Sequence, residues 1–291
     1  MFDQLGLIGC GLMGGSFALA LKRAGLVKRV VGYSKSPSTT ERARALGMID
    51  IEAPSALLAV SGADIVLLAV PVAATEATFK AIRHLVTPNM LVMDVGSTKC
   101  DVIAAAQRAL REHIGIFVPA HPIAGKESAG VDNADVDLYN GCQVILTPDA
   151  RTKPEQLQRA VTLWTALGCQ VKQMSPEAHD AAFAAVSHLP HLIAFALVNA
   201  ITGQGAGYDY LGLAGPGFRD FSRIAGSEPK VWRDILLANR DELLTQSRLF
   251  QHQLKQLEEL MLQGDGAALE ASIERASQVR RHWTMASKDR R

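Results

Sequence analysis

Three glycines with GxGxxG spacing follow the first apolar segment and constrain the fold more than any other feature of the sequence. The segment Leu5–Ile8 predicts a strand, and residues Ser16–Ala24 after the glycines predict a helix. In such a strand–loop–helix unit the glycines permit a tight turn, close approach of a pyrophosphate and close packing of helix on strand. The spacing alone is common in turns, but this context favours a dinucleotide. The predicted cofactor contacts here are Gly9, Gly11, Leu12, Met13 and Gly14.

Short apolar runs alternate with helical patterns through residue 174. This alternation predicts βαβ units and a parallel sheet with helices on its faces. The run that begins at Ile65 is almost continuously apolar, which is typical of a strand buried on both faces. The predicted strands after the first are Arg29–Tyr33, Ile65–Val72, Leu91–Val95, Ile116–Ala120, Gln143–Thr147 and Gln170–Met174.

The pattern changes at Ser175, after which no segment predicts a strand. A long apolar helix over Ala178–Thr202 passes through Pro190, and Gly203–Gly217 is glycine-rich and expected to be irregular. Leucine or phenylalanine then recurs every seven residues from 236 to 257, as on one face of a helix, and a last helix covers Ala267–His282. We therefore predict an α/β Rossmann-type dinucleotide-binding domain over residues 1–172. An all-α domain is expected over residues 173–291.

Charge and cysteine usage exclude several classes of protein. Thirty Lys and Arg residues balance 29 Asp and Glu residues, so no basic field exists to hold a nucleic acid. The four cysteines are scattered without a CxxC motif, which favours reduced thiols over disulfides or a metal site. The first residues show no basic segment and no small-residue cleavage site, so we expect no leader, and the apolar run Ile65–Ala74 is too short to span a bilayer. We expect a cytoplasmic protein without a metal or a membrane partner.

The end of the second predicted strand bears on the choice of dinucleotide. NAD sites usually place Asp or Glu there to hold the ribose hydroxyls, but this strand ends Ser34-Lys35-Ser36. These three side chains suit a 2′-phosphate, so we favour NADP over NAD; alternatively Lys35 is a solvated loop charge and either cofactor binds. Val70 and Pro71, at the end of the next strand, are the remaining predicted cofactor contacts.

Polar side chains cluster at the ends of predicted strands and within an apolar helix, although the fold does not require polar residues at these places. Ser97 lies in the segment Asp94–Lys99, which follows a buried strand and could otherwise serve only as a helix cap. His121 follows another strand and is held by Pro122, which favours a positioned acid or base.

Two further clusters lie in the helical half. His188 and His191 flank a proline. No acidic or cysteine residues lie at ligand spacing, so we do not expect a metal site; alternatively, either histidine is a core residue. An arginine in the segment Gly217–Ala225 could clamp a carboxylate or form a surface ion pair with Asp220.

The motifs GCGLMGGS, DVGSTK, HPIAGKESAG, VSHLPH and GFRDFSRIA, in this order and spacing, resemble the prephenate/arogenate (cyclohexadienyl) dehydrogenases of tyrosine biosynthesis. The resemblance extends over essentially the whole chain. It implies a Rossmann domain, a helical domain that pairs with its twin in a homodimer, and an active site between the domains. The implied reaction is NAD(P)-dependent oxidative decarboxylation of prephenate to 4-hydroxyphenylpyruvate.

The resemblance also implies roles for individual residues. His121 accepts the proton of the ring hydroxyl, with Ser97 close to that hydroxyl and to the nicotinamide. Arg223 binds a substrate carboxylate. The other implied substrate-binding residues are Lys99, Glu127, His191 (ranked above His188) and Trp232.

Other functions remain open on the sequence. An arogenate dehydrogenase would give L-tyrosine directly, and no single residue decides between the two substrates. A β-hydroxyacid-type dehydrogenase also combines a glycine loop with a helical domain, but the HPIAG and SHLPH motifs argue against it. A non-catalytic nucleotide-binding protein would not need Ser97, His121 and Arg223 together.

Overall fold

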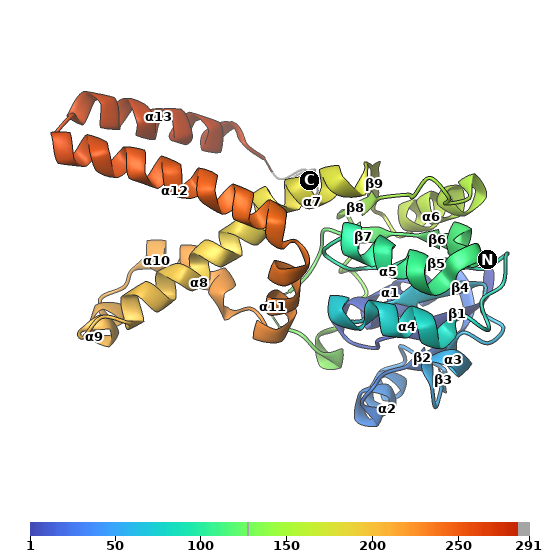
Figure 1. The fold of residues 1–291 in the computed structure, drawn as a ribbon. Helices are drawn as coiled ribbons and strands as arrows, with labels where there is room; N and C mark the ends of the chain where they lie inside the picture. Colours follow the sequence, from blue (N-terminus) through green and yellow to red (C-terminus); the bar gives the residue numbers. More distant parts are fainter. Residues whose placement is uncertain (127, 285–291) are drawn as a thin grey trace.

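The computed structural model describes residues 1–126 and 128–284. An α/β domain formed by the first part of the chain is followed by a helical domain that extends away from it (Figure 1). The predicted fold class is therefore confirmed. The expected domain boundary, after residue 172, lies one residue before the end of the last strand.

The main sheet has six parallel strands in the order β3-β2-β1-β4-β5-β6. The residues of β4 and β5 are buried throughout, as expected for strands covered on both faces by crossover helices. The order reverses between β1 and β4, so the carboxyl ends of these two strands form the crevice in which such sheets bind ligands. The strands are β1 (Phe2–Ile8), β2 (Val27–Tyr33), β3 (Ile51–Glu52), β4 (Ile65–Leu68), β5 (Leu91–Asp94) and β6 (Phe117–Val118).

Two apolar cores cover the faces of this sheet. One is built around the aromatic cluster of Phe17, Tyr139 and Trp164, and the other around the edge-to-face pair Phe79 and Phe117. The helices of the domain are α1 (Leu12–Arg23), α2 (Pro37–Ala45), α3 (Ala56–Ala59), α4 (Thr75–Ile82), α5 (Cys100–Leu110) and α6 (Pro154–Ala166).

A second sheet corrects the prediction that all strands continue one parallel sheet. It contains β7 (Ala120–Pro122), β8 (Gln143–Leu146) and β9 (Gln170–Gln173), with β7 antiparallel to β8 and β8 parallel to β9. Pro119 separates β6 from β7, and proline has no N–H with which to continue a ladder. His121 therefore lies within β7, opposite Ile145, instead of after the end of a strand.

The helical domain begins with a nearly continuous helix that contains one wide turn. A π-helical turn, Ala184–His188, separates α7 (Pro176–Phe183) from α8 (Leu189–Thr202), and Pro190 is the second residue of α8. Proline removes a helical N–H and crowds the carbonyl four residues before it, which the wider turn accommodates. The segment Gly203–Gly217 was predicted to be irregular, but it contains α9 (Gly207–Gly212).

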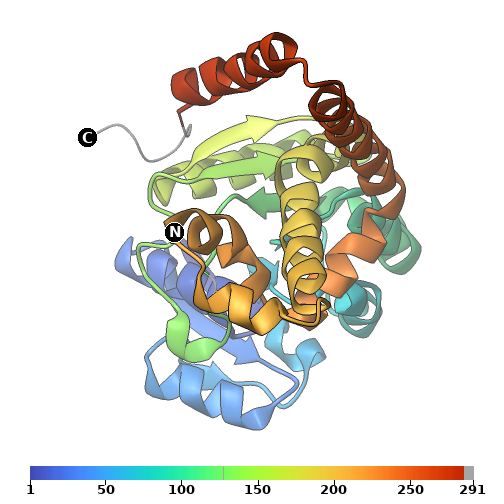
Figure 2. The same cartoon turned by 90° about the vertical axis from the view of Figure 1, so that its left-hand side faces the viewer.

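The remaining helices form two arms that extend from the α/β domain (Figure 1). One arm is the hairpin of α12 (Arg240–Gln263) and α13 (Gly266–His282), and the other consists of α8 and α9. Figure 2 shows α8 standing in front of the sheets when the molecule is viewed from the side of the arms. In the second arm α10 (Pro216–Ser222) lies beside α8, whereas α11 (Pro229–Ala238) lies between the arms and the nucleotide domain.

The helical run Pro176–Thr202 also requires a correction to the sequence analysis. By length and composition it is apolar enough to cross a membrane, whereas the sequence-based prediction considered only the shorter apolar run Ile65–Ala74. Only 17% of its most apolar window is buried within the protomer. Exposed apolar surface of this kind is typical of an interaction site.

Candidate active site

The glycine loop has the stereochemistry that its spacing predicts. Gly9 has a φ of +96°, and a Cβ there would lie 2.2 Å from the backbone oxygen of Ala69. A Cβ on Gly14 would lie 2.0 Å from the backbone oxygen of Gly9. No atom lies within 4 Å of the position of a Cβ on Gly11, so its backbone is open to a ligand. Gly9 and Gly14 thus shape the turn, and Gly11 leaves room for a pyrophosphate.

A cavity of about 400 Å³ opens in front of this loop. The predicted contacts Leu12, Met13, Val70 and Pro71 line it together with Gly11. Ser34, Lys35 and Ser36 lie beyond its lining, at the carboxyl end of β2. The Ser34 hydroxyl accepts the backbone N–H of Cys10 at 2.9 Å, whereas Lys35 and Ser36 are exposed.

A second cavity, of about 610 Å³, adjoins the first. It is lined by His121 of β7, His191 of α8 and Arg223 after α10. Ser97 and Trp232 line both cavities, so the two form one cleft between the α/β and helical domains. Five of the seven residues predicted for catalysis or substrate binding therefore meet at this cleft: Ser97, His121, His191, Arg223 and Trp232.

Trp232 and His191 form one wall of the second cavity. Their rings stack with centroids 3.4 Å apart and planes inclined by 19°. His191 Nδ1 bonds the backbone oxygen of Ser187 at 2.9 Å, which fixes the ring orientation. His188 is fully buried and lines neither cavity; its Nδ1 contacts Asn239 at 3.1 Å. Of these two histidines, His191 lines the cavity and His188 does not.

Lys99 occupies a different place from the one expected of a substrate-binding residue. Its side chain is completely buried, and its ammonium contacts the carboxylate of Asp94 at 2.5 Å and the backbone oxygen of Ala120 at 2.8 Å. It lines neither cavity because the long aliphatic stem is directed under the loop that carries Ser97. Glu127 lies outside the described residues.

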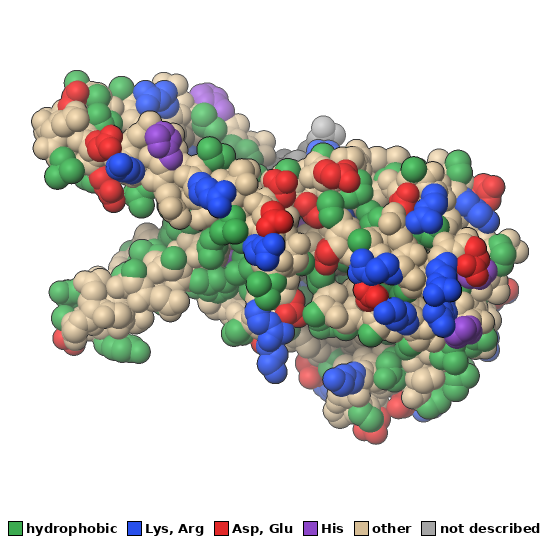
Figure 3. All heavy atoms as spheres, in the orientation of Figure 1, with side chains coloured by type: hydrophobic (Ala, Val, Ile, Leu, Met, Phe, Trp, Pro, Cys, Tyr) green, Lys and Arg blue, Asp and Glu red, His purple; other side chains and the backbone are tan. Residues whose placement is uncertain are grey.

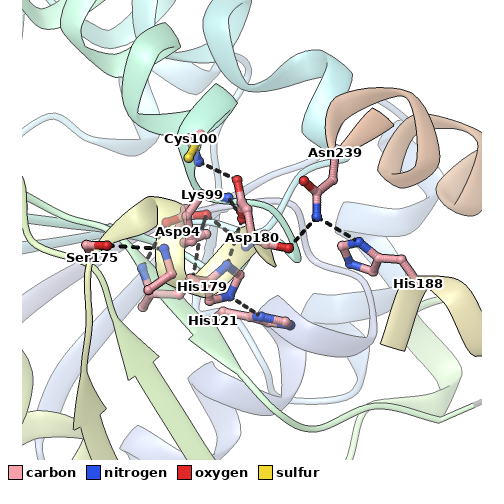
Figure 4. Close-up of polar contacts among 12 residues, drawn as sticks. Asp94, Lys99, Cys100, His121, Ser175, His179, Asp180, His188 and Asn239 are labelled. Carbon is pink, nitrogen blue, oxygen red and sulfur yellow. Dashed lines mark hydrogen bonds and ion pairs between the residues drawn. The ribbon is translucent and has the colours of Figure 1, made fainter. Parts of the chain in front are cut away.

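His121 is the first member of a buried hydrogen-bonded chain (Figure 4). Its Nδ1 lies 2.8 Å from Nε2 of His179, and Nδ1 of His179 lies 2.7 Å from the Asp180 carboxylate. That carboxylate also accepts the backbone N–H groups of Lys99 and Cys100, each at 2.9 Å. These two N–H groups hold the Asp180 end of the chain in place.

Physical chemistry fixes the proton positions along this chain. Burial works to raise the pKa of Asp180, but hydrogen bonds from His179 and from backbone N–H groups prevail, so the pKa is lowered and the group is a carboxylate. A carboxylate only accepts, so His179 carries its hydrogen on Nδ1 and accepts from Nδ1–H of His121. Nε2 of His121 is then an unprotonated acceptor, available to a molecule in the cavity.

The surroundings of His121 also keep its ring neutral. Burial, followed by the influence of His179, Lys99 and His188, lowers the pKa of His121 well below its usual value. Burial lowers the pKa of His179 as well, although Asp180 opposes this shift. The site therefore presents a neutral imidazole with a free ring nitrogen, the form that a general base requires.

Sequence reasoning missed His179 and Asp180. They are adjacent polar residues on the buried side of α7, in the helix immediately after the domain boundary. A histidine–aspartate pair at the start of an otherwise apolar helix was the available signal. Nothing in the local pattern indicated that it would meet His121, which lies 58 residues earlier.

Comparison with known proteins identifies the family. Residues 17–173 match the family model "Prephenate dehydrogenase, nucleotide-binding domain", and residues 175–275 match "Prephenate dehydrogenase, dimerization domain". The chain belongs to the prephenate dehydrogenase family. The resemblance inferred from the sequence motifs is confirmed.

Related proteins span nearly the whole chain. A cyclohexadienyl dehydrogenase of Zymomonas mobilis is 37% identical over 268 residues, covering 91% of each protein. A prephenate dehydrogenase of Bacillus subtilis is 37% identical over 246 residues. The aligned region covers 84% of this chain and 66% of that relative. The structure of prephenate dehydrogenase from Aquifex aeolicus in complex with hydroxyphenyl propionate and NAD+ is 35% identical. It superposes with a TM-score of 0.90, covering 96% of this chain and 97% of the other.

Proposed function

We propose that the protein is a prephenate (cyclohexadienyl) dehydrogenase, which oxidises and decarboxylates prephenate to 4-hydroxyphenylpyruvate with NAD(P)+. The observation that carries this proposal is the His121–His179–Asp180 chain, which leaves an unprotonated ring nitrogen at the second cavity, next to the cavity of the glycine loop. Family membership and the named activities of the relatives support the same reaction.

The residues of the cleft divide the work of the reaction. A dinucleotide held with its pyrophosphate at the glycine loop would supply, through its nicotinamide, the acceptor for the hydride that leaves ring C4. His121 Nε2 takes the proton of the C4 hydroxyl, and Ser97 lies where it can hydrogen-bond that oxygen. Arg223 holds a carboxylate, since a guanidinium pairs with it in a bidentate manner. The ring carboxylate departs as CO2, its bonding electrons complete the aromatic ring, and no metal or covalent intermediate is needed.

The first test measures reduced nicotinamide formed from prephenate, or separately from arogenate, by the purified protein. His121→Asn should lower kcat by orders of magnitude while the Kd for the dinucleotide is preserved, since the ring touches the reacting hydroxyl and not the glycine loop. Arg223→Ala should raise KM instead. Normal turnover by His121→Asn would refute the assignment of the base.

We propose a preference for NADP+ over NAD+. The end of β2 carries no acidic residue to repel a 2′-phosphate, and Lys35 and Ser36 are exposed beside the N-terminus of α2. Titration of both cofactors into wild type and Lys35→Ala tests this: the substitution should weaken NADP+ and leave NAD+ unchanged. Tighter binding of NAD+ than of NADP+ by the wild type would refute it.

We further propose a cytoplasmic homodimer formed through the helical domain. Val186, Leu213 and Leu262 are between 71% and 87% exposed, and Figure 3 shows hydrophobic side chains along both arms. A second copy that covers these faces would account for the apolar run Pro176–Thr202 without a membrane. All four cysteines are free thiols, which agrees with a reducing compartment. Light scattering of the purified protein measures the dimer directly.

A further inference from the structure

The buried ion pair of Asp94 and Lys99 lies behind the cleft and takes no part in the proposed transfer of the proton or the hydride. The side chains of Asp94 and Lys99 are 4% and 0% exposed, and neither lines a cavity. An ion pair this deep contributes little stability compared with apolar residues of the same volume, because both charges lose their hydration. The groups that this ion pair holds in place therefore indicate its role.

The pair holds both polar groups of one residue (Figure 4). The backbone N–H of Ala120 donates to Asp94 Oδ1 at 3.0 Å, and its backbone oxygen accepts from Lys99 Nζ at 2.8 Å. Ala120 directly precedes His121 in β7. The ion pair thereby fixes the peptide groups on either side of this residue and the direction in which the next side chain leaves the strand.

The pair also closes the loop that carries Ser97. Asp94 ends β5 and Lys99 precedes α5, so their contact joins the two ends of a six-residue segment. Within it, the N–H of Gly96 donates to Asp94 Oδ2 at 2.8 Å, and Gly96 and Ser97 line the cofactor cavity. The backbone N–H of Lys99 donates to Asp180, the last member of the histidine chain.

We propose that the Asp94–Lys99 ion pair is the positioning element of the active site, fixing Ser97 and His121 relative to each other so that both contact one substrate hydroxyl. This inference rests on the proposed function and extends it. Lys99 is a positioning residue that acts through the Ala120 peptide. Its ammonium has a second effect, since a buried cation near the ring opposes protonation of the base.

Five groups determine the charge around His121. His179 of α7 and His188 of the π-helical turn carry no charge when neutral, and Asp180 and Asp94 are the neighbouring carboxylates. Lys99 is the cation that, together with burial, lowers the pKa of His121. Removing that cation while both carboxylates remain should raise the pKa of His121. On acidification the variant should therefore be protonated, and lose activity, at a higher pH than the wild type.

The decisive variant is Lys99→Met, which keeps the length of the stem and removes the charge. We expect kcat to fall about 100-fold, the loss typical of a small misplacement of a reacting group, with the Kd for NADP+ nearly unchanged. The acid limb of the pH profile should move to higher pH. If the unpaired Asp94 prevents folding, Asp94→Asn/Lys99→Met removes both charges and should show the same fall in kcat.

Two comparisons separate positioning from loss of stability. In the His121→Asn background, Lys99→Met should lower kcat by a much smaller factor than in wild type, because one of the two groups that it positions is already gone. Ile82→Ala removes side-chain volume from the core under α4, away from the cleft, and should destabilise the fold with kcat retained. An equal fractional loss of kcat from Lys99→Met in both backgrounds would overturn the proposal.

A readout without substrate keeps the inference separate from the proposed function. Ring-nitrogen NMR, assigned by comparison with His121→Asn, follows the titration of His121 in wild type and Lys99→Met. We expect a higher midpoint in the variant; an unchanged midpoint together with unchanged kcat overturns the positioning role. A wild type that turns over neither prephenate nor arogenate rejects the proposed function alone, and the titration then decides the inference.

Discussion

Replacement of Asp180 by asparagine tests the direction of the proton chain at its far end. The carboxylate accepts three hydrogen bonds, from His179 Nδ1 at 2.7 Å and from the backbone N–H groups of Lys99 and Cys100 at 2.9 Å. Asparagine offers one oxygen and one NH2 group in the same space. Whichever way the amide lies, its NH2 group opposes at least one of these donors.

Both orientations of the amide impair the base. When the NH2 group faces His179, the hydrogens along the chain reverse and His121 Nε2 carries a hydrogen, so it cannot accept one. When the oxygen faces His179, the backbone N–H of Cys100 is left opposed, and the negative charge that stabilises protonated His121 is lost. A hydrogen bond to a charged group contributes about 1.5–3 kcal/mol. At 1.36 kcal/mol per factor of ten, this corresponds to a kcat about 10- to 100-fold lower.

Steady-state turnover of prephenate provides the assay, with cofactor affinity measured by fluorescence titration. KM and the Kd for NADP+ should change little, because Asp180 does not line the glycine-loop cavity. Asp149→Asn is the matched control: that carboxylate also accepts a backbone N–H, from Arg151 at 3.0 Å, but it lines neither cavity. Wild-type kcat in a folded Asp180→Asn protein would refute the reasoning.

Three further outcomes follow from the geometry. Because burial lowers the pKa of His121 and only the neutral ring is a base, the acid limb of kcat/KM should lie below pH 6.5; a limb near pH 7 would contradict this. Burial lowers the pKa of His188 to about 4, so on acidification from pH 6.5 the unfolded chain takes up a proton on this residue before the folded chain does. The free energy of unfolding should therefore fall by about 3 kcal/mol between pH values above 6.5 and pH 4. Urea unfolding of wild type and His188→Leu measures that difference, which the variant should lack. Gly14→Ala should destabilise the fold, since its Cβ would lie 2.0 Å from a backbone oxygen of the loop, whereas Gly11→Ala should keep wild-type stability and weaken dinucleotide binding.

The sequence was informative wherever the physical cause is local. Gly9 and Gly14 are required by backbone sterics within a few residues, and periodicity distinguished the buried strands from the long helix α12. These signals predicted the nucleotide domain, the helical domain and the loop at which a dinucleotide binds. Family motifs then placed Ser97, His121, His191, Arg223 and Trp232, which meet at one cleft in the structure.

Predictions failed where strand pairing and burial depend on distant parts of the chain. The strand series up to Gln173 looked uniform along the sequence, but Pro119 and the antiparallel pairing of β7 with β8 divide it into two sheets. The family resemblance implied that Lys99 binds substrate, but its side chain is completely buried and lines neither cavity. Its partner Asp94 and the Ala120 carbonyl, brought together by the two sheets, offset the cost of burial.

The sequence by itself determined the kind of cofactor and the order of the two domains, since glycine sterics and strand–helix alternation act over short stretches. The family of chemistry followed from the resemblance of its motifs to a known family. Only the tertiary structure decided which nitrogen of His121 is left without a hydrogen and can accept a proton. That decision depends on His179 and Asp180, which approach from a different domain 58 and more residues away. A proton position depends on contacts between distant segments, and no local pattern contains them.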